Sequence, residues 1–222
     1  MLWSDEGYLL SRSNYSENSI IIEVFTLNHG KYTGIVYGGS SSKQKRNFQI
    51  GNKLIVNWKS KNENRNGYFT VELSYPISPF YFDDKKKSTC ILSSTSILKI
   101  LLPERQINKS IYKSFASLLE NLSNINWIKS YIFWELNLIK ELGFEINFLN
   151  NNKVLKNNNF IEFNEKTYKV PKILCSDDKK TFTTGDIKEA LIFNKRLLTE
   201  NFVEPNKIKI PLYRNLLENY FS

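Results

Sequence analysis

Alternating hydrophobic and polar positions dominate the first 75 residues of the chain. In residues 68–73, tyrosine, threonine and glutamate alternate with phenylalanine, valine and leucine, the period of a half-buried strand. Four further stretches, residues 7–12, 19–26, 31–37 and 53–58, are also β-prone because they are rich in β-branched or aromatic residues. Five short strands with glycine-containing turns predict a five-stranded closed barrel of the OB type. A small SH3-like barrel has a similar strand count and remains an alternative.

Helical periodicity follows a proline-rich and charged segment, residues 76–88. Apolar residues spaced three and four apart predict helices near residues 89–102, 110–122, 125–142, 184–198 and 211–220. Two short β-prone runs between them, residues 160–163 and 167–170, predict a hairpin. We therefore expect a β + α two-domain protein. Its N-terminal OB-fold barrel takes residues 1–78, and its mostly α-helical C-terminal domain takes residues 79–222.

Three details of this plan concern single side chains. The adjacent aromatics Phe80, Tyr81 and Phe82 are expected to fill the seam between the two domains, because three exposed aromatic rings would be costly. Glu135 lies near the apolar stripe of its predicted helix, where we expect a carboxylate hydrogen-bonded across helices. His29 lies in a turn signal, Asn28-His29-Gly30, and is expected to pack there.

The overall charge favours a polyanionic partner. The chain has 222 residues, a formal net charge of +9 and a pI of about 9.3, which suits nucleic acid or an anionic membrane. The same Lys-, Asn- and Ile-rich composition also arises from an AT-rich genome without any functional pressure. The N-terminus does not read as a signal peptide, and no run reaches the ~18 apolar residues of a membrane helix. We therefore expect a soluble cytoplasmic, nucleoid-associated protein.

Catalytic and metal-binding motifs are missing from the sequence. It contains no Walker, nucleophile-elbow, zincin or Rossmann pattern, so we expect no enzyme. Cys90, Cys175 and the single His29 are too few for a structural zinc site, so we expect neither metal nor cofactor. Two distant cysteines also fit a reducing compartment.

The strongest binding signal begins at Gly38. Gly38-Gly39 and three serines precede six basic residues between Lys43 and Lys61, a stretch without any acidic residue. Such a loop between strands suits close approach to a phosphate backbone, and aromatics could add stacking platforms. Tyr32, Tyr37 and Trp58 are further stacking candidates, for which core packing is the alternative role. The predicted DNA-binding residues are Arg12, Lys31, Lys43, Lys45, Arg46, Lys53, Lys59, Lys61 and Tyr15.

A series of short motifs follows in a fixed order along the chain. They are residues 3–11 with 15–19, Phe25-Thr26 with His29-Gly30, Gly38-Gly39 through Gln49-Ile50-Gly51-Asn52, residues 101–105 with Tyr112, and Glu135-Leu136 with residues 141–144. The order and spacing of these motifs are more specific than any one of them. Taken together, they resemble the RecO family of bacterial DNA repair proteins, and in particular its alphaproteobacterial branch.

The resemblance implies an OB-fold followed by a helical domain. It implies binding of single- and double-stranded DNA, annealing of complementary strands, and partnership with RecR and with the C-terminal tail of single-stranded DNA-binding protein (SSB). Many relatives carry a four-cysteine zinc module, but residues 147–168 contain no cysteine, which implies that zinc is absent here. Because the SSB tail is acidic with an apolar end, Lys113 and Lys129 of the helical domain are candidate contacts.

Two other classes of function remain open from the residues alone. One is an RNA-binding OB-fold protein of the translation machinery. The other is a protein-interaction scaffold whose positive charge reflects genome composition. Binding to matched DNA and RNA oligonucleotides separates the first from a DNA-binding mediator, and charge reversal in the basic loop separates the second.

Overall fold

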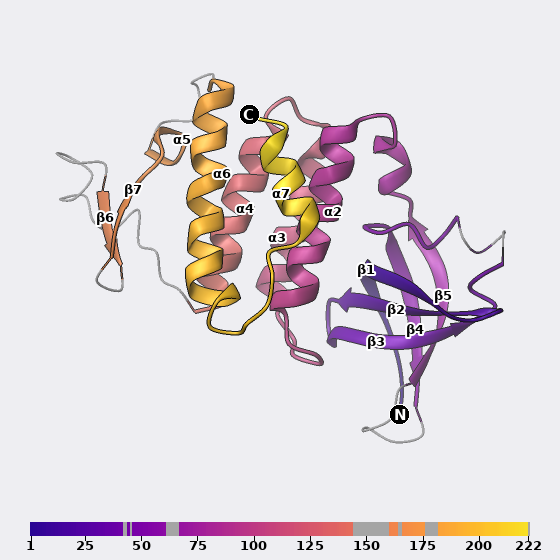
Figure 1. Cartoon of the computed structure of the whole chain (residues 1–222). Coiled ribbons are helices and arrows are strands. Elements are labelled where there is room, and N and C mark those ends of the chain that lie inside the picture. Colours follow the sequence, from indigo (N-terminus) through magenta and orange to yellow (C-terminus); the bar gives the residue numbers. More distant parts are fainter. Residues whose placement is uncertain are drawn as a thin grey trace. The chain divides into compact units, whose positions relative to one another are not determined.

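A computed structural model describes residues 1–41, 44, 46–60, 67–143, 160–163, 166–175 and 182–221, with backbone alone for 161–163 and 166. The described residues form two compact units (Figure 1). The first contains Met1–Lys113 and Pro211–Arg214, and the second contains Ser114–Ile210 and Asn215–Ser222. The predicted domain boundary, with a nucleic-acid-binding domain ending at residue 78 and a helical domain following it, stays a prediction.

The first unit is built on a closed five-stranded barrel. Its strands follow the order β1-β2-β3-β5-β4, and β1 closes the barrel by pairing with β4. The contact of β3 with β5 is parallel and short, whereas the other strand pairs are antiparallel. This OB-like arrangement confirms the predicted fold. The strands are β1 (Leu2–Ser16), β2 (Ser19–Thr26), β3 (Gly30–Tyr37), β4 (Lys53–Lys59) and β5 (Gly67–Tyr75).

The barrel interior is filled by aliphatic side chains and by Trp58, which is 2% exposed. Gly34 and Gly67 face this indole, and a Cβ at either position would lie within 2.5 Å of its ring. Glycine is therefore required where β3 and β5 pass over the tryptophan. Phe48, from the connection between β3 and β4, is fully buried in the same core.

The end of the β3–β4 connection is held by Asn52, which is fully buried. Its Oδ1 accepts hydrogen bonds from the backbone amides of Ile77 and Ser78 at 2.9 and 3.1 Å, and its Nδ2 donates to the Asn47 carbonyl at 3.2 Å. One side chain thus satisfies backbone groups of two separate segments, as buried polar groups require. The segment that carries the basic residues is fixed where it re-enters the barrel.

Gly51, next to this asparagine, has a φ of +91°. A Cβ there would lie 2.3 Å from Cγ2 of Ile91, a residue of α2 (Lys85–Leu101). Both the left-handed backbone and the close approach of the helix therefore require glycine at this position.

Helix α2 begins after a 3₁₀ turn, η1 (Ser78–Tyr81). Asp84 caps the helix by accepting hydrogen bonds from the amides of Lys86 and Lys87. Lys85 and Lys86 are exposed at the start of the helix. At its other end, Lys31 Nζ of β3 donates to the Lys99 carbonyl at 2.6 Å. A cation at a helix C-terminus complements the helix dipole.

The aromatics before α2 do not behave as predicted. Phe80 and Phe82 are 65% and 58% exposed, so the expectation that they fill a seam is wrong for both. Ile77 and Ser78 take the inward side of this turn instead, each 8% exposed. Two large apolar rings of this turn are therefore exposed to solvent.

The remaining elements are helices, short helical turns and one hairpin, of which the hairpin and the helices of eight or more residues lie close to the predicted ranges. No helix of the described residues is long and apolar enough to cross a membrane. The elements are α3 (Lys109–Glu120), η2 (Asn121–Ser123), α4 (Trp127–Glu141), β6 (Phe160–Phe163), β7 (Lys166–Lys169), α5 (Lys172–Cys175), α6 (Thr184–Leu198), the π-helical turn η3 (Thr199–Val203) and α7 (Leu212–Asn219).

Helices α4 and α6 share a buried polar network in the second unit. Glu135, fully buried, accepts hydrogen bonds from Tyr131 Oη at 2.7 Å and from Asn194 Nδ2 of α6 at 3.2 Å. The amide of Asn194 also donates to the Ile132 carbonyl at 2.9 Å. The prediction of a cross-helix carboxylate is therefore confirmed, because the acid joins two helices rather than facing a cleft.

Candidate nucleic-acid interface

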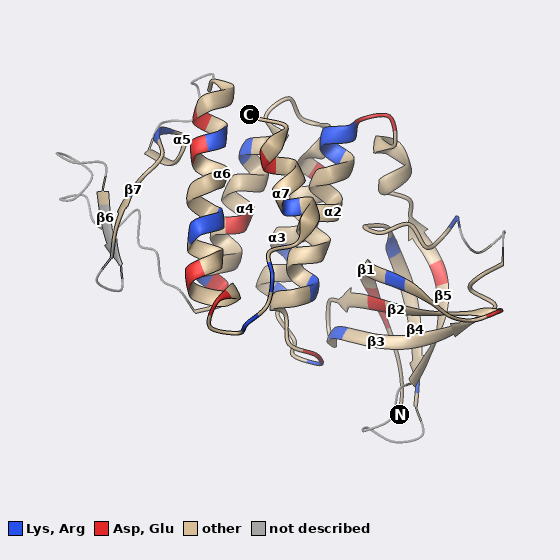
Figure 2. Cartoon of the chain, in the orientation of Figure 1, with Lys and Arg blue, Asp and Glu red and all other residues tan. Residues whose placement is uncertain are grey.

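The predicted DNA-binding residues differ widely in their surroundings. Lys43, Lys45 and Lys61 lie outside the described residues. Basic side chains occur along the barrel strands and on helices α2 and α6 (Figure 2), so charge alone does not locate an interface. The other candidates are distinguished by burial and by their partners.

Lys31 lies on the face of the barrel that packs against the end of α2. It is 8% exposed, and its ammonium donates to the Lys99 carbonyl. Burial lowers the pKa of Lys31 below its ordinary value, against the opposing influence of the Glu23 and Glu104 carboxylates. Lys31 is therefore a poor candidate for a phosphate contact, because its ammonium caps a helix and the residue is only 8% exposed.

The same covered face holds Lys99 and Tyr112. Lys99 Nζ pairs with Glu23 at 3.0 Å. Tyr112, 3% exposed, lies 5.2 Å from the ring of Tyr8 and 5.6 Å from that of Phe25. We call Glu23, Lys31, Lys99 and Tyr112 the covered face.

Lys53, at the start of β4, is also engaged by other side chains. Its Nζ lies 2.9 Å from Glu6 Oε1 and 5.9 Å from the centre of the Tyr8 ring. Its side chain is 26% exposed. A phosphate would have to compete with the carboxylate for this cation, so Lys53 is a weaker candidate than a free surface lysine.

A second face of the barrel combines cation and aromatics at the surface. Tyr37 is 68% exposed and Tyr68 37% exposed, and their ring centres are 6.0 Å apart. Lys59 is the cross-strand partner of Tyr68, so both side chains point to the outer surface. Lys59 is exposed and pairs with no carboxylate among the described residues. We call Tyr37, Lys59 and Tyr68 the open-face cluster.

Tyr68 was not among the predicted site residues. The alternation in β5 correctly places it outward, but that pattern also fits any solvent-facing tyrosine. Its pairing with Tyr37 depends on the parallel contact of β5 with β3, where Ile35 lies opposite Tyr68. No local sequence signal contains that contact.

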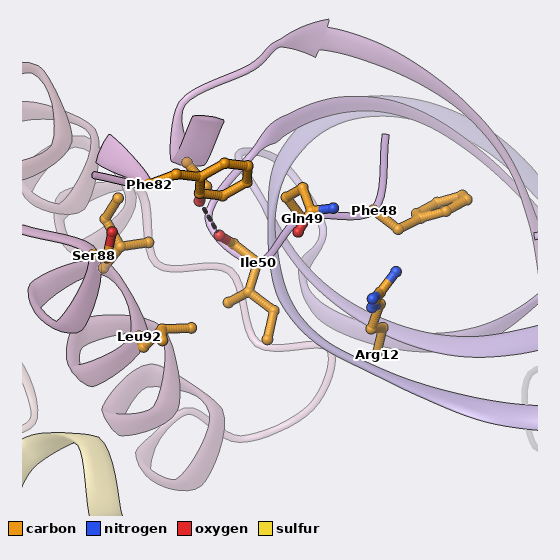
Figure 3. A pocket seen from close by; sticks show the side chains of 9 residues that line it. Arg12, Phe48, Gln49, Ile50, Phe82, Ser88 and Leu92 are labelled. Carbon is orange, nitrogen blue, oxygen red and sulfur yellow. Dashed lines mark hydrogen bonds between the residues drawn. The ribbon is translucent and has the colours of Figure 1, made fainter. Parts of the chain in front are cut away.

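Arg12, Tyr15 and Arg46 are all exposed. Tyr15, at the end of β1, is 58% exposed. Arg12 lines a cavity of about 230 Å³ beside the β3–β4 connection (Figure 3). Neither arginine forms an ion pair with a described residue, so both are available to an anionic ligand, and the exposed ring of Tyr15 is open to stacking.

The remaining stacking candidates belong to the barrel interior. Trp58 is buried, and Tyr32 packs edge-on against Trp3 and Trp58 at 4.9 and 5.2 Å between ring centres. Arg105 lies over the Tyr32 ring at 5.5 Å. The alternative role of core packing therefore holds for both, and neither ring is open to a base.

His29 packs in its turn, as expected. Its ring stacks on Trp3 with centres 4.0 Å apart, and Nδ1 lies 2.8 Å from Asp5 Oδ2. Burial raises the pKa of Asp5, but hydrogen bonds from His29 and from the amides of Asn28 and Glu6 outweigh it and hold that pKa below 3.8. These residues join β1 to the β2–β3 turn and form no reactive centre.

The two candidate partner-binding lysines lie in different surroundings. Lys113 is exposed on α3. Lys129 Nζ lies 5.7 Å from the centre of the Phe133 ring and 5.4 Å from that of Phe182. Phe133 also borders a cavity of about 290 Å³ whose other described walls are mainly serine hydroxyls, an asparagine amide, Leu118 and Trp134. These largely polar walls match the apolar end of the SSB tail poorly.

Metal-binding groups do not gather in the part of the chain that the structure describes. No set of three or more histidine, cysteine, aspartate or glutamate side chains lies together there. Cys90 is buried and Cys175 is exposed, and neither is in a disulfide. The predicted absence of zinc stays a prediction, because most of residues 147–168 lie outside the described part.

Comparison with known proteins gives matches along most of the chain. The family model "Recombination protein O N terminal" matches residues 1–76, and "Recombination protein O C terminal" matches residues 83–183. A protein of Cereibacter sphaeroides named DNA repair protein RecO is 34% identical over 142 residues, which are 64% of this chain and 60% of that protein.

Two further relatives carry the same name. The Wolbachia protein is 34% identical over 148 residues, or 66% of this chain and 61% of its own. The protein of Dinoroseobacter shibae is 33% identical over 143 residues, or 64% and 59%. The matched part of the chain thus spans about three fifths of the length of these curated relatives.

Proposed function

The chain belongs to the RecO family, and from that premise we propose that it is a DNA-binding mediator of recombination repair. It binds single- and double-stranded DNA and anneals complementary strands. No covalent bond is made or broken in this function.

The observation that carries the proposal is the open-face cluster. Nonspecific single-strand binders combine a cationic surface with aromatic rings on which bases stack. Tyr37 and Tyr68 offer two exposed rings, and Lys59 stands beside them without a carboxylate partner among the described residues. Lys43, Lys45 and Arg46 belong to the connection that follows Tyr37 in the chain.

Annealing follows from charge neutralisation. Two DNA strands repel each other because each carries closely spaced phosphates, and a protein with surplus positive charge reduces that repulsion. The net charge of +9 supplies such a surplus. Stacking on tyrosine does not depend on base identity, so the strand remains free to find its complement.

We propose that the partners are RecR and the C-terminal tail of SSB, and that binding to them helps to load recombinase on SSB-coated DNA. Lys113 and Lys129 are the candidate contacts to the acidic tail. Strand annealing on DNA coated with SSB, with and without its tail, tests this part. Equal rates with both forms of SSB would exclude a role for the tail.

The DNA-binding part is tested by the salt dependence of affinity for a single-stranded oligonucleotide. The logarithm of affinity should fall linearly with the logarithm of salt, with a slope of about −0.7 per neutralised phosphate. Reversing Lys43, Lys45 and Arg46 together to glutamate should reduce both the affinity and the slope. An unchanged affinity would favour a protein-interaction scaffold with incidental charge.

RNA binding is the alternative for the same surface, because stacking and phosphate contacts do not by themselves distinguish the sugars. Recognition of RNA would require contacts to the 2′-hydroxyl. Competition between DNA and RNA oligonucleotides of matched sequence decides this point. Preference for the RNA would exclude the proposed function.

A further inference from the structure

The cavity lined by Arg12 lies wholly within the first unit and has an apolar floor. Its volume is about 230 Å³, below the roughly 300–1,000 Å³ of pockets for drug-sized ligands. Side chains from β1, the β3–β4 connection, the segment after η1 and α2 meet there. The apolar walls include Phe48, Ile50, Phe82, Ile91 and Leu92.

Phe82 gives this cavity an exposed aromatic ring. The ring lines the apolar floor and is nevertheless 58% exposed. Exposed apolar area of this kind is unfavourable in water, at roughly 25 cal/mol per Å². A flat apolar ligand lying against Phe82 would cover it.

The charged and polar groups of the cavity lie beside this ring. In Figure 3, Gln49 lies between Phe82 and Arg12. Arg12 is exposed, and the described lining residues include no carboxylate. A guanidinium in such a place suits a phosphate, which it can bind with two parallel hydrogen bonds.

The walls are held in place before any ligand arrives. Ser78 Oγ donates to the Ile50 carbonyl, and Ser88 Oγ donates to the Tyr81 carbonyl, one residue before Phe82. Asn52 fixes the chain two residues after Ile50. A preformed site loses less conformational entropy on binding than a flexible one.

We propose that this cavity, the Arg12–Phe82 pocket, receives one unstacked base of a single DNA strand. The base stacks on Phe82, the amide of Gln49 faces its polar edge, and Arg12 binds an adjoining phosphate. This proposal rests on the proposed DNA-binding function and gives the strand a second point of contact besides the open-face cluster. The small volume favours one base over a longer apolar segment.

The test compares two neighbouring phenylalanines with oligothymidylate and with an abasic sugar–phosphate oligomer of equal length. Phe82→Ala should weaken binding of oligothymidylate by about five-fold or more, the effect of losing one stacked base. Phe80→Ala is the matched control, because Phe80 is 65% exposed but does not line the cavity. Neither variant should change binding of the abasic oligomer.

Two further variants give readouts that a purely structural role would not move. Phe82→Trp should keep the affinity, and its indole fluorescence should be quenched by oligothymidylate but not by the abasic oligomer. Arg12→Gln should make the salt slope for oligothymidylate shallower by about 0.7, the value for one phosphate contact.

The outcomes separate this proposal from the one on which it rests. If Phe82→Ala and Phe80→Ala bind oligothymidylate equally well, the pocket takes no base, while salt-dependent binding by the wild type still supports the proposed function. If the wild type binds neither oligomer, both proposals fall. If an acidic peptide with a free C-terminal carboxylate quenches the Phe82→Trp variant and oligothymidylate does not, the pocket belongs to a peptide.

Discussion

The covered face and the open-face cluster lie on the same small barrel, yet they use the same residue types in opposite ways. On the covered face, Lys31 and Tyr112 are buried, and their polar atoms are bound to the Lys99 carbonyl and to Glu6. In the open-face cluster, Lys59 and two tyrosines face solvent. A lysine or tyrosine at or near the barrel surface is therefore not by itself a binding residue, and what packs over it decides its role.

The largest expected effect is a loss of stability from a substitution where α2 meets the barrel. Gly51→Ala forces a left-handed backbone on alanine and pushes its Cβ against Ile91, at 2.3 Å in the present geometry. We expect the free energy of unfolding to fall by about 2–4 kcal/mol. Urea denaturation measures this loss. An unchanged stability would mean that α2 is not tightly packed on this side of the barrel.

The open-face cluster should respond in binding and not in stability. Tyr68→Ala removes one ring of the exposed pair, so we expect single-strand affinity to weaken by about 1–3 kcal/mol. Fluorescence anisotropy at fixed salt measures this change. Tyr75→Ala is the matched control, because Tyr75 is an exposed tyrosine at the other end of β5. Equal losses for both variants would remove the distinction between the cluster and ordinary surface tyrosines.

Alkaline pH distinguishes the covered tyrosine from the exposed ones. Burial, with smaller contributions from Tyr8 and Glu6, raises the pKa of Tyr112 far above its ordinary value of 10.0. The unfolded chain releases this proton near pH 10 and the folded chain retains it, so stability is full below pH 10 and falls as pH rises further. The expected slope is about 1.4 kcal/mol per pH unit.

Tyr112→Phe provides the comparison for this slope, because phenylalanine keeps the ring contacts and has no proton to release. The difference in unfolding free energy between the two proteins should change above pH 10 and stay constant below it. Parallel curves through pH 10 would show that Tyr112 ionises equally easily in the folded state.

The smallest expected effect is a change in the salt dependence of DNA binding. It should appear on replacing Lys59 of the open-face cluster and not on replacing Lys31 of the covered face. Lys59→Gln should make the salt slope of DNA binding shallower by about 0.7, because one phosphate contact is lost. Lys31→Met should leave that slope unchanged, since the Lys31 ammonium is bound to a carbonyl and is shielded from solvent. Titration of affinity against salt for both variants checks the contrast. A shallower slope for Lys31→Met with an unchanged slope for Lys59→Gln would mean that the covered face, and not the open-face cluster, contacts phosphate.

These contrasts also show what the sequence could predict. Alternation and helical spacing predicted the five strands, the hairpin and the helices of eight or more residues, because each pattern depends on neighbours within one element. The short helix α5 was not predicted, and β1 extends well beyond the predicted residues 7–12. The cross-helix role of Glu135 followed from its position beside an apolar stripe. The start of α6 is fixed by a capping box between Thr183 and Asp186, one residue before the predicted range.

The candidate site was harder to predict because it depends on contacts between distant residues. Lys31 begins one β-prone run and Lys59 directly follows another, and only the packing of α2 buries one of them. Lys53 is engaged by Glu6, which is 47 residues away in the sequence. The pairing of Tyr37 with Tyr68 depends on strand order. Local sequence carries no information on such pairings, so it overestimated the number of available cations.

The buried anchor at Phe48 and Asn52 has a consequence for how this segment can change length. Phe48 fills the barrel core and Asn52 holds the backbone of Ile77 and Ser78, so the spacing from Phe48 to β4 is fixed. Residues added or deleted after Phe48 would move its side chain out of the core or pull Asn52 away from the amides of Ile77 and Ser78.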